Sequence, residues 1–387
     1  MSRSTDPGHF FQTTTYLTES ARKASKSKNT FGNPLKLTSK ILAVAADPEN
    51  NNRVYVAEAA GATSEISAVY TGPAAPLTSL YISTHSNTLF AGCWDKSIWS
   101  WSCSTRKPAQ RYQGHNDFVK AVLCVSVHGR EILISGSTDA SIIVWDVRTG
   151  DKLHILKGHT RGVLALAIDP FTLSEPTVYG TEQAKASDEA IAFFSAGSDR
   201  EIRRWSLTSV SASEVPSAPE SPSPILSHDT SVDALRFDAD GDLWTASADK
   251  SAKCLSRQQN WEADTELTHP DFVRDVVVDE EGGWVVTACR DEQVRVWEKG
   301  SGKLYHTFDG HFEEVTGLVL LSGQRLVSVS IDATIRQWSL KAPDLEKARK
   351  EAENERLGNE KEQEGNKESL LTEDEERELA ELMDESE

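Results

Sequence analysis

Serine, histidine and aspartate residues recur together along this chain, and in many hydrolases these side chains perform nucleophilic catalysis. One set consists of His115, Ser135 and Asp139, and it is followed by Trp145. A catalytic triad needs one nucleophile, one base and one orienting carboxylate in a single cleft. Because a His, a Ser or Thr and an Asp recur in this order five times, we expect structural hydrogen bonds instead of catalysis.

The repeated sets have a fixed internal spacing. In the stretch SGSTDASIIVWD, an aliphatic residue follows Asp139 after three positions, and Trp145 follows it after six. The stretch recurs around five other Asp residues, one of which has Leu255 in place of the Trp: Asp95, Asp199, Asp249, Asp291 and Asp332. Successive copies lie 41 to 60 residues apart. A basic period of ~40–45 residues is typical of a four-stranded propeller blade.

The elements that must position these residues are short strands. Innermost strands are expected to begin at Leu77, Val119, Val163, Val232, Val273 and Val315. Residues 38–71 lack the Asp and Trp, and they predict a degenerate first blade with strands at 41–45, 54–56 and 65–70. Insertions at 171–190 and 209–224 explain the long intervals. The second is too rich in Pro and Ser for a strand, so we expect a mobile surface loop.

The recurring Gly-His start, Ser or Thr, Asp and Trp resemble the WD-repeat family over residues 38–340. The resemblance implies an all-β fold, a seven-bladed propeller of four-stranded antiparallel blades. In the family an N-terminal strand completes the last blade, and residues 9–18 are the candidate here. Residues 1–37 would then form a basic, Ser/Thr-rich extension, and residues 341–387 an acidic, partly helical tail of charged, coiled-coil-like composition.

In WD-repeat proteins the recurring polar residues form a buried hydrogen-bond chain within each blade. The resemblance implies four such sets here: His115, Ser135, Asp139 and Trp145; His159, Ser195, Asp199 and Trp205; His269, Thr287, Asp291 and Trp297; and His311, Ser328, Asp332 and Trp338. Each buried polar group would have a partner, and for that reason its burial is tolerated.

Composition narrows the function classes. The net charge is −19, which argues against direct nucleic-acid binding, because phosphate contacts need clustered Lys and Arg. No apolar run approaches the ~18 residues of a membrane span. The five Cys residues form no CxxC pair, which favours reduced thiols in the cytoplasm or nucleus. We find no phosphate-binding loop and no HExxH motif, and we therefore expect no enzyme activity, no cofactor and no metal site.

The family resemblance implies a scaffold that binds proteins or peptides and helps to assemble a multiprotein complex, for instance of the chromatin or ribonucleoprotein type. Partners of such propellers dock on the face with the loops before the innermost strands. The expected binding residues there are Trp94, Phe118, Phe272, Arg290 and Phe312. Alternatively, the stretch Trp145-Asp146-Val147-Arg148 resembles the element by which some WD-repeat receptors dock on cullin-type ubiquitin ligases.

Both ends of the chain carry further signals. Residues 344–387 hold 18 acidic and 7 basic residues. Thr372 and Glu375 form a capping box, and Leu379, Leu382 and Met383 then share one face of a predicted helix. This helix is either a recognition element for a partner or part of a solvated tail. Residues 21–30 are expected to form a solvated loop. The alternatives are a nuclear localisation signal and a kinase site at Ser25.

Overall fold

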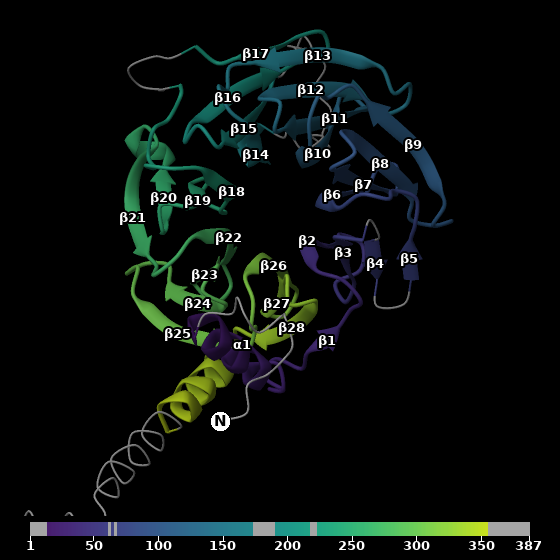
Figure 1. The fold of residues 1–387 in the computed structure, drawn as a ribbon. Coiled ribbons are helices and arrows are strands. Elements are labelled where there is room, and N and C mark those ends of the chain that lie inside the picture. Colours follow the sequence, from purple (N-terminus) through teal and green to yellow (C-terminus); the bar gives the residue numbers. More distant parts are fainter. Residues whose placement is uncertain (1–13, 61–62, 66–67, 173–189, 217–222, 355–387) are drawn as a thin grey trace, which may run out of the picture. The chain divides into compact units, whose positions relative to one another are not determined.

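The computed structural model describes residues 14–60, 63–65, 68–172, 190–216 and 223–354. Over these residues the strands form seven four-stranded antiparallel sheets, which follow one another around a ring (Figure 1). The prediction of an all-β propeller built from four-stranded antiparallel blades is therefore confirmed.

The innermost strands surround the central channel. They are β2 (Ile41–Ala46), β6 (Leu77–Ser83), β10 (Val119–Val127), β14 (Val163–Ile168), β18 (Val232–Phe237), β22 (Val273–Asp279) and β26 (Val315–Leu321). Six of these strands begin at the residues predicted from the sequence. The second strands are β3 (Val54–Glu58), β7 (Thr88–Cys93), β11 (Arg130–Ser137), β15 (Ile191–Gly197), β19 (Leu243–Ser247), β23 (Trp284–Cys289) and β27 (Arg325–Ser330).

The outer half of each sheet holds two more strands. The third strands are β4 (Thr63–Glu65), β8 (Ser97–Ser102), β12 (Ser141–Asp146), β16 (Ile202–Leu207), β20 (Ser251–Ser256), β24 (Gln293–Glu298) and β28 (Thr334–Ser339). The outermost are β5 (Ala68–Tyr70), β9 (Pro108–Gln113), β13 (Lys152–Lys157), β17 (Ala212–Glu214), β21 (Glu262–Thr268), β25 (Leu304–Asp309) and β1 (Leu35–Lys36). Two short 3-10 helices lie at Pro170–Thr172 and Arg257–Gln259.

The apolar core lies between neighbouring blades. One cluster joins Ile142 of β12 to Val163 of β14 and Phe193 of β15, and these three residues come from two successive sheets. All six residues of β12 are buried, because each blade is covered on both faces. Double coverage explains why these strands show continuous apolar runs instead of an alternation of apolar and polar residues.

A β-bulge stands at the start of every innermost strand. The pairing register slips between the first and third residues, for example between Val119 and Ala121, which leaves Lys120 unpaired in the ladder. The same slip occurs at Ile41/Ala43, Leu77/Ser79, Val163/Ala165, Val232/Ala234, Val273/Asp275 and Val315/Gly317. A bulge re-aims the extra side chain, and these second residues all line the central channel.

The ring is closed by a short strand that the sequence did not indicate. Leu35 pairs with Ile335 and Lys36 pairs with Thr334, so β1 completes the sheet of β26, β27 and β28. The prediction that residues 9–18 provide this strand is wrong where the chain is described, because Thr14–Lys26 is the helix α1. Gly32 has φ +66° and lies against Trp338, which fits a residue without a side chain at this turn.

Three other expectations are corrected. Residues 21–26 belong to α1 and not to a loop. Within the 209–224 insertion, Ala212–Glu214 forms the edge strand β17, because Thr208 and Ser211 make a tight turn that returns the chain to β16. In the first blade, residues 65–70 are divided between β4 and β5 instead of forming one strand.

The C-terminal segment forms a separate unit from residue 341 onward, and a helix begins at residue 342 and continues to residue 354, the last described there. Ion pairs between Lys350 and Glu346, one helical turn apart, accompany it. The predicted recognition helix with Leu379, Leu382 and Met383 lies outside the described residues. In the described part of the chain, no helix is long and apolar enough to cross a membrane.

Candidate partner-binding face

The recurring Asp residues shape one face of the ring. Each stands in the turn between a second and a third strand; the carboxylate of Asp139, for example, accepts hydrogen bonds from the Ser141 amide (2.9 Å) and hydroxyl (2.6 Å). The residue after the Asp adopts a positive φ, which is 64° at Ala140. These turns and the loops before the innermost strands form what we call the channel face.

The loops of the channel face are fastened by the recurring polar residues. In the blade of β10 to β13, the Asp139 carboxylate accepts a bond from His115 Nδ1 at 3.2 Å. His115 Nε2 lies 2.7 Å from the Ser135 hydroxyl, which also accepts a bond from the Trp145 indole at 2.9 Å. The Asn116 amide donates to Asp139 at 2.7 Å. The carboxylate therefore binds both the His115 imidazole and the backbone of the loop that follows it.

Two other blades contain the complete set. His159 contacts Asp199 at 3.0 Å and Ser195 at 2.7 Å, and Trp205 donates to Ser195 at 2.7 Å. His311 contacts Asp332 at 3.0 Å and Ser328 at 2.8 Å, and Trp338 donates to Ser328 at 2.9 Å. In the blade with Leu255, His228 still contacts Asp249 at 2.8 Å and Thr245 at 2.7 Å.

The blade of β22 to β25 departs from the predicted set. His269 Nε2 contacts Thr287 at 2.7 Å, but its Nδ1 donates to the Leu267 carbonyl at 3.0 Å instead of to Asp291. The Asp291 carboxylate binds the Arg295 guanidinium at 2.5 Å and 3.1 Å. The expected His269–Asp291 contact is therefore wrong. A buried cation four residues along the turn competes for the carboxylate more strongly than a neutral imidazole does.

Because the Asp291 carboxylate binds Arg295 and not His269, the buried His269 imidazole is difficult to protonate. Burial, together with the nearby Arg295 cation, lowers the pKa of His269 from 6.5 to about 4. Between these two pH values the unfolded chain binds a proton that the folded chain does not. The folded state is therefore favoured above pH 6.5 and loses stability as the pH falls toward 4, by up to about 3 kcal/mol.

We expect the substitution His269→Gln to reduce this pH dependence, since Gln can bond both Leu267 and Thr287 without titrating. The measurement is urea unfolding of both proteins at pH values from 7.5 to 4.5. The slope of unfolding free energy against pH near pH 5 should be smaller in the variant by close to one proton, about 1.4 kcal/mol per pH unit. Equal slopes would show that His269 does not titrate as described.

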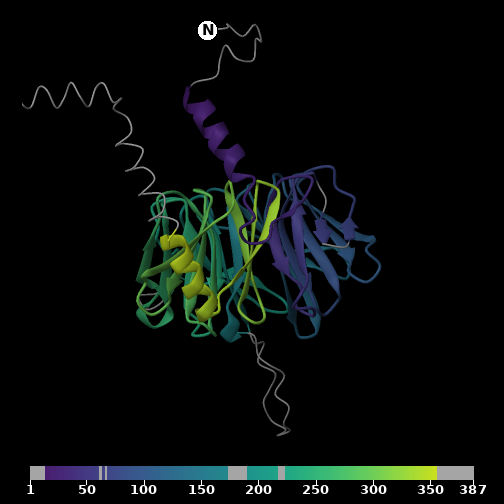
Figure 2. The ribbon, with the colours of Figure 1, turned by 90° about the horizontal axis from the view of Figure 1, so that it is seen from below.

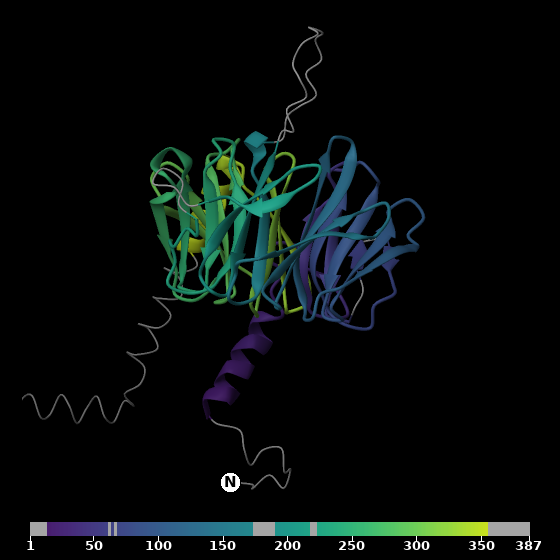
Figure 3. The ribbon, with the colours of Figure 1, turned by 90° about the horizontal axis from the view of Figure 1, so that it is seen from above.

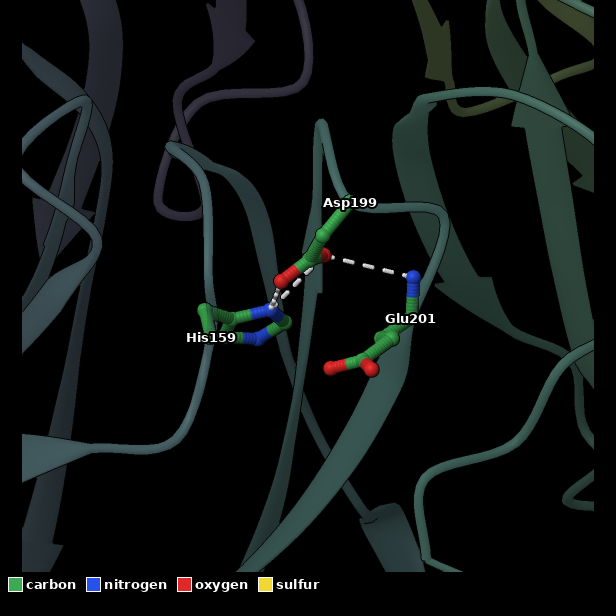
Figure 4. A group of neighbouring side chains, drawn as sticks. All are labelled: His159, Asp199 and Glu201. Atoms are coloured by element: carbon green, nitrogen blue, oxygen red, sulfur yellow. Dashed lines mark hydrogen bonds and ion pairs between the residues drawn. The ribbon is translucent and has the colours of Figure 1, made fainter.

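Two groups of side chains have the spacing of metal ligands, and one of them includes His159 and Asp199 of the recurring sets. His159, Asp199 and Glu201 place ligand atoms within 4.8 Å of one another (Figure 4). Both ring nitrogens of His159 are already in hydrogen bonds, and the Glu201 carboxylate is bound by Arg203 at 2.7 Å. In a second group of the described residues, Asp238, Asp242 and Cys254, burial raises the pKa of the Cys254 thiol to about 12. Both groups fit structural networks better than metal ligation.

Aromatic side chains gather on the channel face. Trp94 and Phe118 stack with ring centroids 4.9 Å apart, and Trp94 remains 39% exposed. The Arg290 guanidinium lies over the Phe272 ring at 5.0 Å. Phe312 is half-buried, and its amide donates to Asp332 at 3.2 Å. Trp94 stacks on Phe118 and Arg290 lies over Phe272, but no ring stacking or cation–π contact joins these two pairs to each other or to Phe312 among the described residues.

Charged residues in the channel lie beside these aromatic pairs, and they were not predicted. Lys120 lies 5.4 Å from the centroid of the Trp94 ring, and burial lowers the pKa of its ammonium group. Arg274 binds Asp233 at 2.7 Å and also contacts Glu314. Three of these residues directly follow the predicted strand starts Val119, Val232 and Val273, so the bulge position was the available signal.

Lys120 differs from its neighbour Arg274. Arg274 has two carboxylate partners, whereas no ion pair joins Lys120 to another side chain in the described ranges. Its ammonium group is nevertheless partly desolvated, and Arg274 lowers its pKa further. The carboxylates of Asp233 and Asp117 offset only part of this effect, because the pKa of Lys120 stays below its usual value. An incoming carboxylate would stabilise the protonated form of this partly desolvated cation.

The stretch Trp145-Asp146-Val147-Arg148 has a structural explanation. The Asp146 side chain is buried, accepts hydrogen bonds from the Arg148 and Thr149 amides at 2.7 and 3.1 Å, and is bound by Arg130 at 2.7 Å. It therefore stabilises the turn between β12 and β13. Arg148 is exposed.

Residues 64–102, 106–146, 263–298 and 302–339 match the family described as WD domain, G-beta repeat. WD repeat-containing protein C126.01c of Schizosaccharomyces pombe is 33% identical over 356 residues, which cover 87% of this chain and 89% of that protein. The chain belongs to the WD-repeat family.

Two other relatives match about half of this chain. Nuclear distribution protein nudF of Aspergillus niger is 28% identical over 214 residues, which cover 52% of this chain and 40% of nudF. Pre-mRNA-processing factor 19 of Mus musculus is 26% identical over 186 residues, which cover 48% of this chain and 32% of that protein. The aligned part is less than half of either relative.

Proposed function

We propose that this protein is a non-catalytic scaffold that binds a peptide segment of a partner protein on the channel face. The observation that carries the proposal is the stack of Trp94 on Phe118, with Lys120 beside it at the mouth of the channel. Aromatic residues next to a cation are typical anchors of protein interfaces. The polar sets beneath them are occupied by structural hydrogen bonds, which leaves the face itself as the functional surface.

The chemistry of the face defines the segment it would bind. The Trp94–Phe118 stack offers apolar surface, so it suits an apolar side chain of the partner. The Lys120 ammonium group suits a carboxylate, because an opposite charge would stabilise its protonated form. We therefore propose an acidic segment with one apolar anchor. Arg290 over Phe272 would provide a second contact farther around the ring.

The substitutions Trp94→Ala and Phe272→Ala together should abolish binding and leave the melting temperature nearly unchanged. Trp94 is 39% exposed and Phe272 is half-buried in the loops of the channel face, so the loss of stability should be small compared with a core substitution. The measurement is affinity purification with quantitative mass spectrometry, followed by thermal melts of each protein.

The matched control replaces Ile155 and Leu304 by Ala, since these residues are 55% and 49% exposed on the outermost strands β13 and β25. This control removes a similar amount of exposed apolar surface away from the channel. If the Trp94 and Phe272 variant still recovers the main partner, the channel face is not the binding surface.

The complex that this scaffold would serve is of the chromatin or ribonucleoprotein type in our proposal. One relative is named as a pre-mRNA-processing factor and another as a nuclear distribution protein, which supports a role in a multiprotein assembly. Cytoplasm and nucleus are both compatible with these names.

Docking on a cullin-type ubiquitin ligase is the second candidate, and the exposure of Arg148 beside a fixed turn favours it. Its test is co-purification of a cullin adaptor that is lost with Arg148→Ala. Asp146 is not a useful test position, because its substitution would disturb the turn itself.

A further inference from the structure

The helix α1 is attached to the channel face by charge. Arg22 binds the Glu292 carboxylate through two bonds of 2.6 and 2.8 Å, and Lys26 binds the same carboxylate at 3.0 Å. Lys23 reaches Glu313 at 3.0 Å, and Lys26 also reaches Asp309 at 2.6 Å. Figures 2 and 3 show α1 standing out from one face of the ring, with its C-terminal end toward the blades.

The helix has little apolar contact with the ring. Leu17 is 45% exposed, and Ala21 and Ala24 are also exposed. Three cations in the last two turns of α1, Arg22, Lys23 and Lys26, form ion pairs with carboxylates of the blades. The Glu292 carboxylate is buried, whereas the Arg22 guanidinium is half-exposed, so these ion pairs lie at the edge of the solvent. The attachment depends on the three cations together.

Ser25 is an exposed residue in the middle of these cations. Arg22 stands three positions before it, Lys23 two positions before it and Lys26 directly after it. Residues three apart on a helix are neighbours, so a phosphate on Ser25 can reach the Arg22 guanidinium. Charge patterns of this kind are also what distinguishes the substrates of kinases that select basic residues before the serine.

We propose that Ser25 is a phosphorylation site and that the phosphate releases α1 from Glu292 and Glu313. The Ser25 hydroxyl oxygen forms a bond to the γ-phosphorus of ATP, and the bond from that phosphorus to the bridging oxygen breaks. ADP leaves, and the hydroxyl proton passes to a base of the kinase. The inference does not depend on the peptide-binding function proposed above.

Three effects of the phosphate act in the same direction. It carries a charge of about −1.5 to −2 and competes with Glu292 for Arg22 and Lys26. It adds negative charge at the C-terminal end of a helix, where the helix dipole disfavours it. It also places negative charge next to the carboxylates of Glu292 and Glu313. A 13-residue helix is marginal in isolation, so loss of these contacts should also unfold α1.

Release changes the channel face. Glu292 lies two positions after Arg290, and Glu313 directly follows Phe312. Both carboxylates would be uncovered beside predicted binding residues, and that part of the face would become more acidic.

The modification is tested on the full chain with ATP and a protein kinase that selects Arg at the third position before the phosphorylated serine. One phosphate should appear at Ser25, and Ser25→Ala should lose it. Ser27→Ala is the matched control and should keep it, since Ala24 stands three positions before Ser27. Absence of phosphate at Ser25 would overturn the site.

The release is tested without a kinase, by genetically encoded phosphoserine at position 25. Hydrogen exchange of residues 14–26 should become faster by about tenfold, as expected when a few charge-assisted bonds are lost. Glu292→Gln should give the same increase without phosphate, and phosphoserine should add little to that variant. If the Glu292→Gln protein folds poorly, Arg22→Gln removes the same ion pair. Equal exchange with and without phosphate would overturn the release.

Discussion

Removal of residues 1–36 should lower the free energy of unfolding by about 3–5 kcal/mol. The truncation deletes β1, so Thr334 and Ile335 lose their strand partners. It also removes the partners of Arg336, a buried residue whose guanidinium donates to Asn29 Oδ1 at 2.8 Å and to the Phe31 carbonyl. A buried cation without hydrogen-bond partners is among the most destabilising features in a protein.

The control for this truncation is removal of residues 1–28. That protein keeps Asn29, Phe31 and β1 and loses only the earlier residues and α1, so its unfolding free energy should stay within about 1 kcal/mol of the full chain. Urea unfolding of all three proteins makes the comparison. If the shorter truncation is as destabilising as the longer one, closure depends on residues before 29 and not on β1.

The substitution Asp332→Ala should have the second largest effect, a loss of about 2–4 kcal/mol. The Asp332 side chain is 0% exposed. Its carboxylate accepts bonds from His311 (3.0 Å), from the Phe312 amide (3.2 Å) and from both the amide and the hydroxyl of Thr334 (2.7 and 2.6 Å). Alanine would leave four donors without their acceptor.

Asp139→Ala is the comparison, because Asp139 accepts the corresponding bonds from His115, Asn116 and Ser141 while its side chain is 9% exposed. Water can replace some of the hydrogen bonds that Asp139 accepts. The expected loss of unfolding free energy is therefore smaller, about 1–3 kcal/mol. Thermal and urea unfolding of both variants provide the test. A large loss at one position and none at the other would mean that one of these sets has a special role and is not a repeated structural unit.

The strand starts and the hydrogen-bonded sets could be predicted because the same residue types recur at the same spacing. His269 and Asp291 show where this reasoning fails. The spacing is intact there, but Arg295 takes the carboxylate, and a repeat pattern does not reveal such a competitor. Lys120 and Arg274 were missed for a different reason: they follow a strand start, and only the bulge turns them into the channel.

The prediction of the ring-closing strand was wrong because it rested on local strand propensity alone. Residues 9–18 are rich in aromatic and β-branched residues, which favour strands on propensity alone. Leu35 and Lys36 form a strand of two residues, whose pairing with β28 is supported by contacts of Gly32 and Asn29 with residues about 300 positions away. Such long-range contacts override propensity, and a single sequence does not show them.

The most direct test of the binding face is a photo-crosslinking amino acid placed at Phe118, with a second protein carrying it at Ile155 as the control. Phe118 stacks on Trp94 at the channel mouth, whereas Ile155 is exposed on β13 at the outer edge. After illumination in cells, the label at position 118 should join one acidic, apolar-anchored segment of a partner protein, and the label at position 155 should not. Crosslinks to that partner from position 155 alone would contradict the assignment of the channel face.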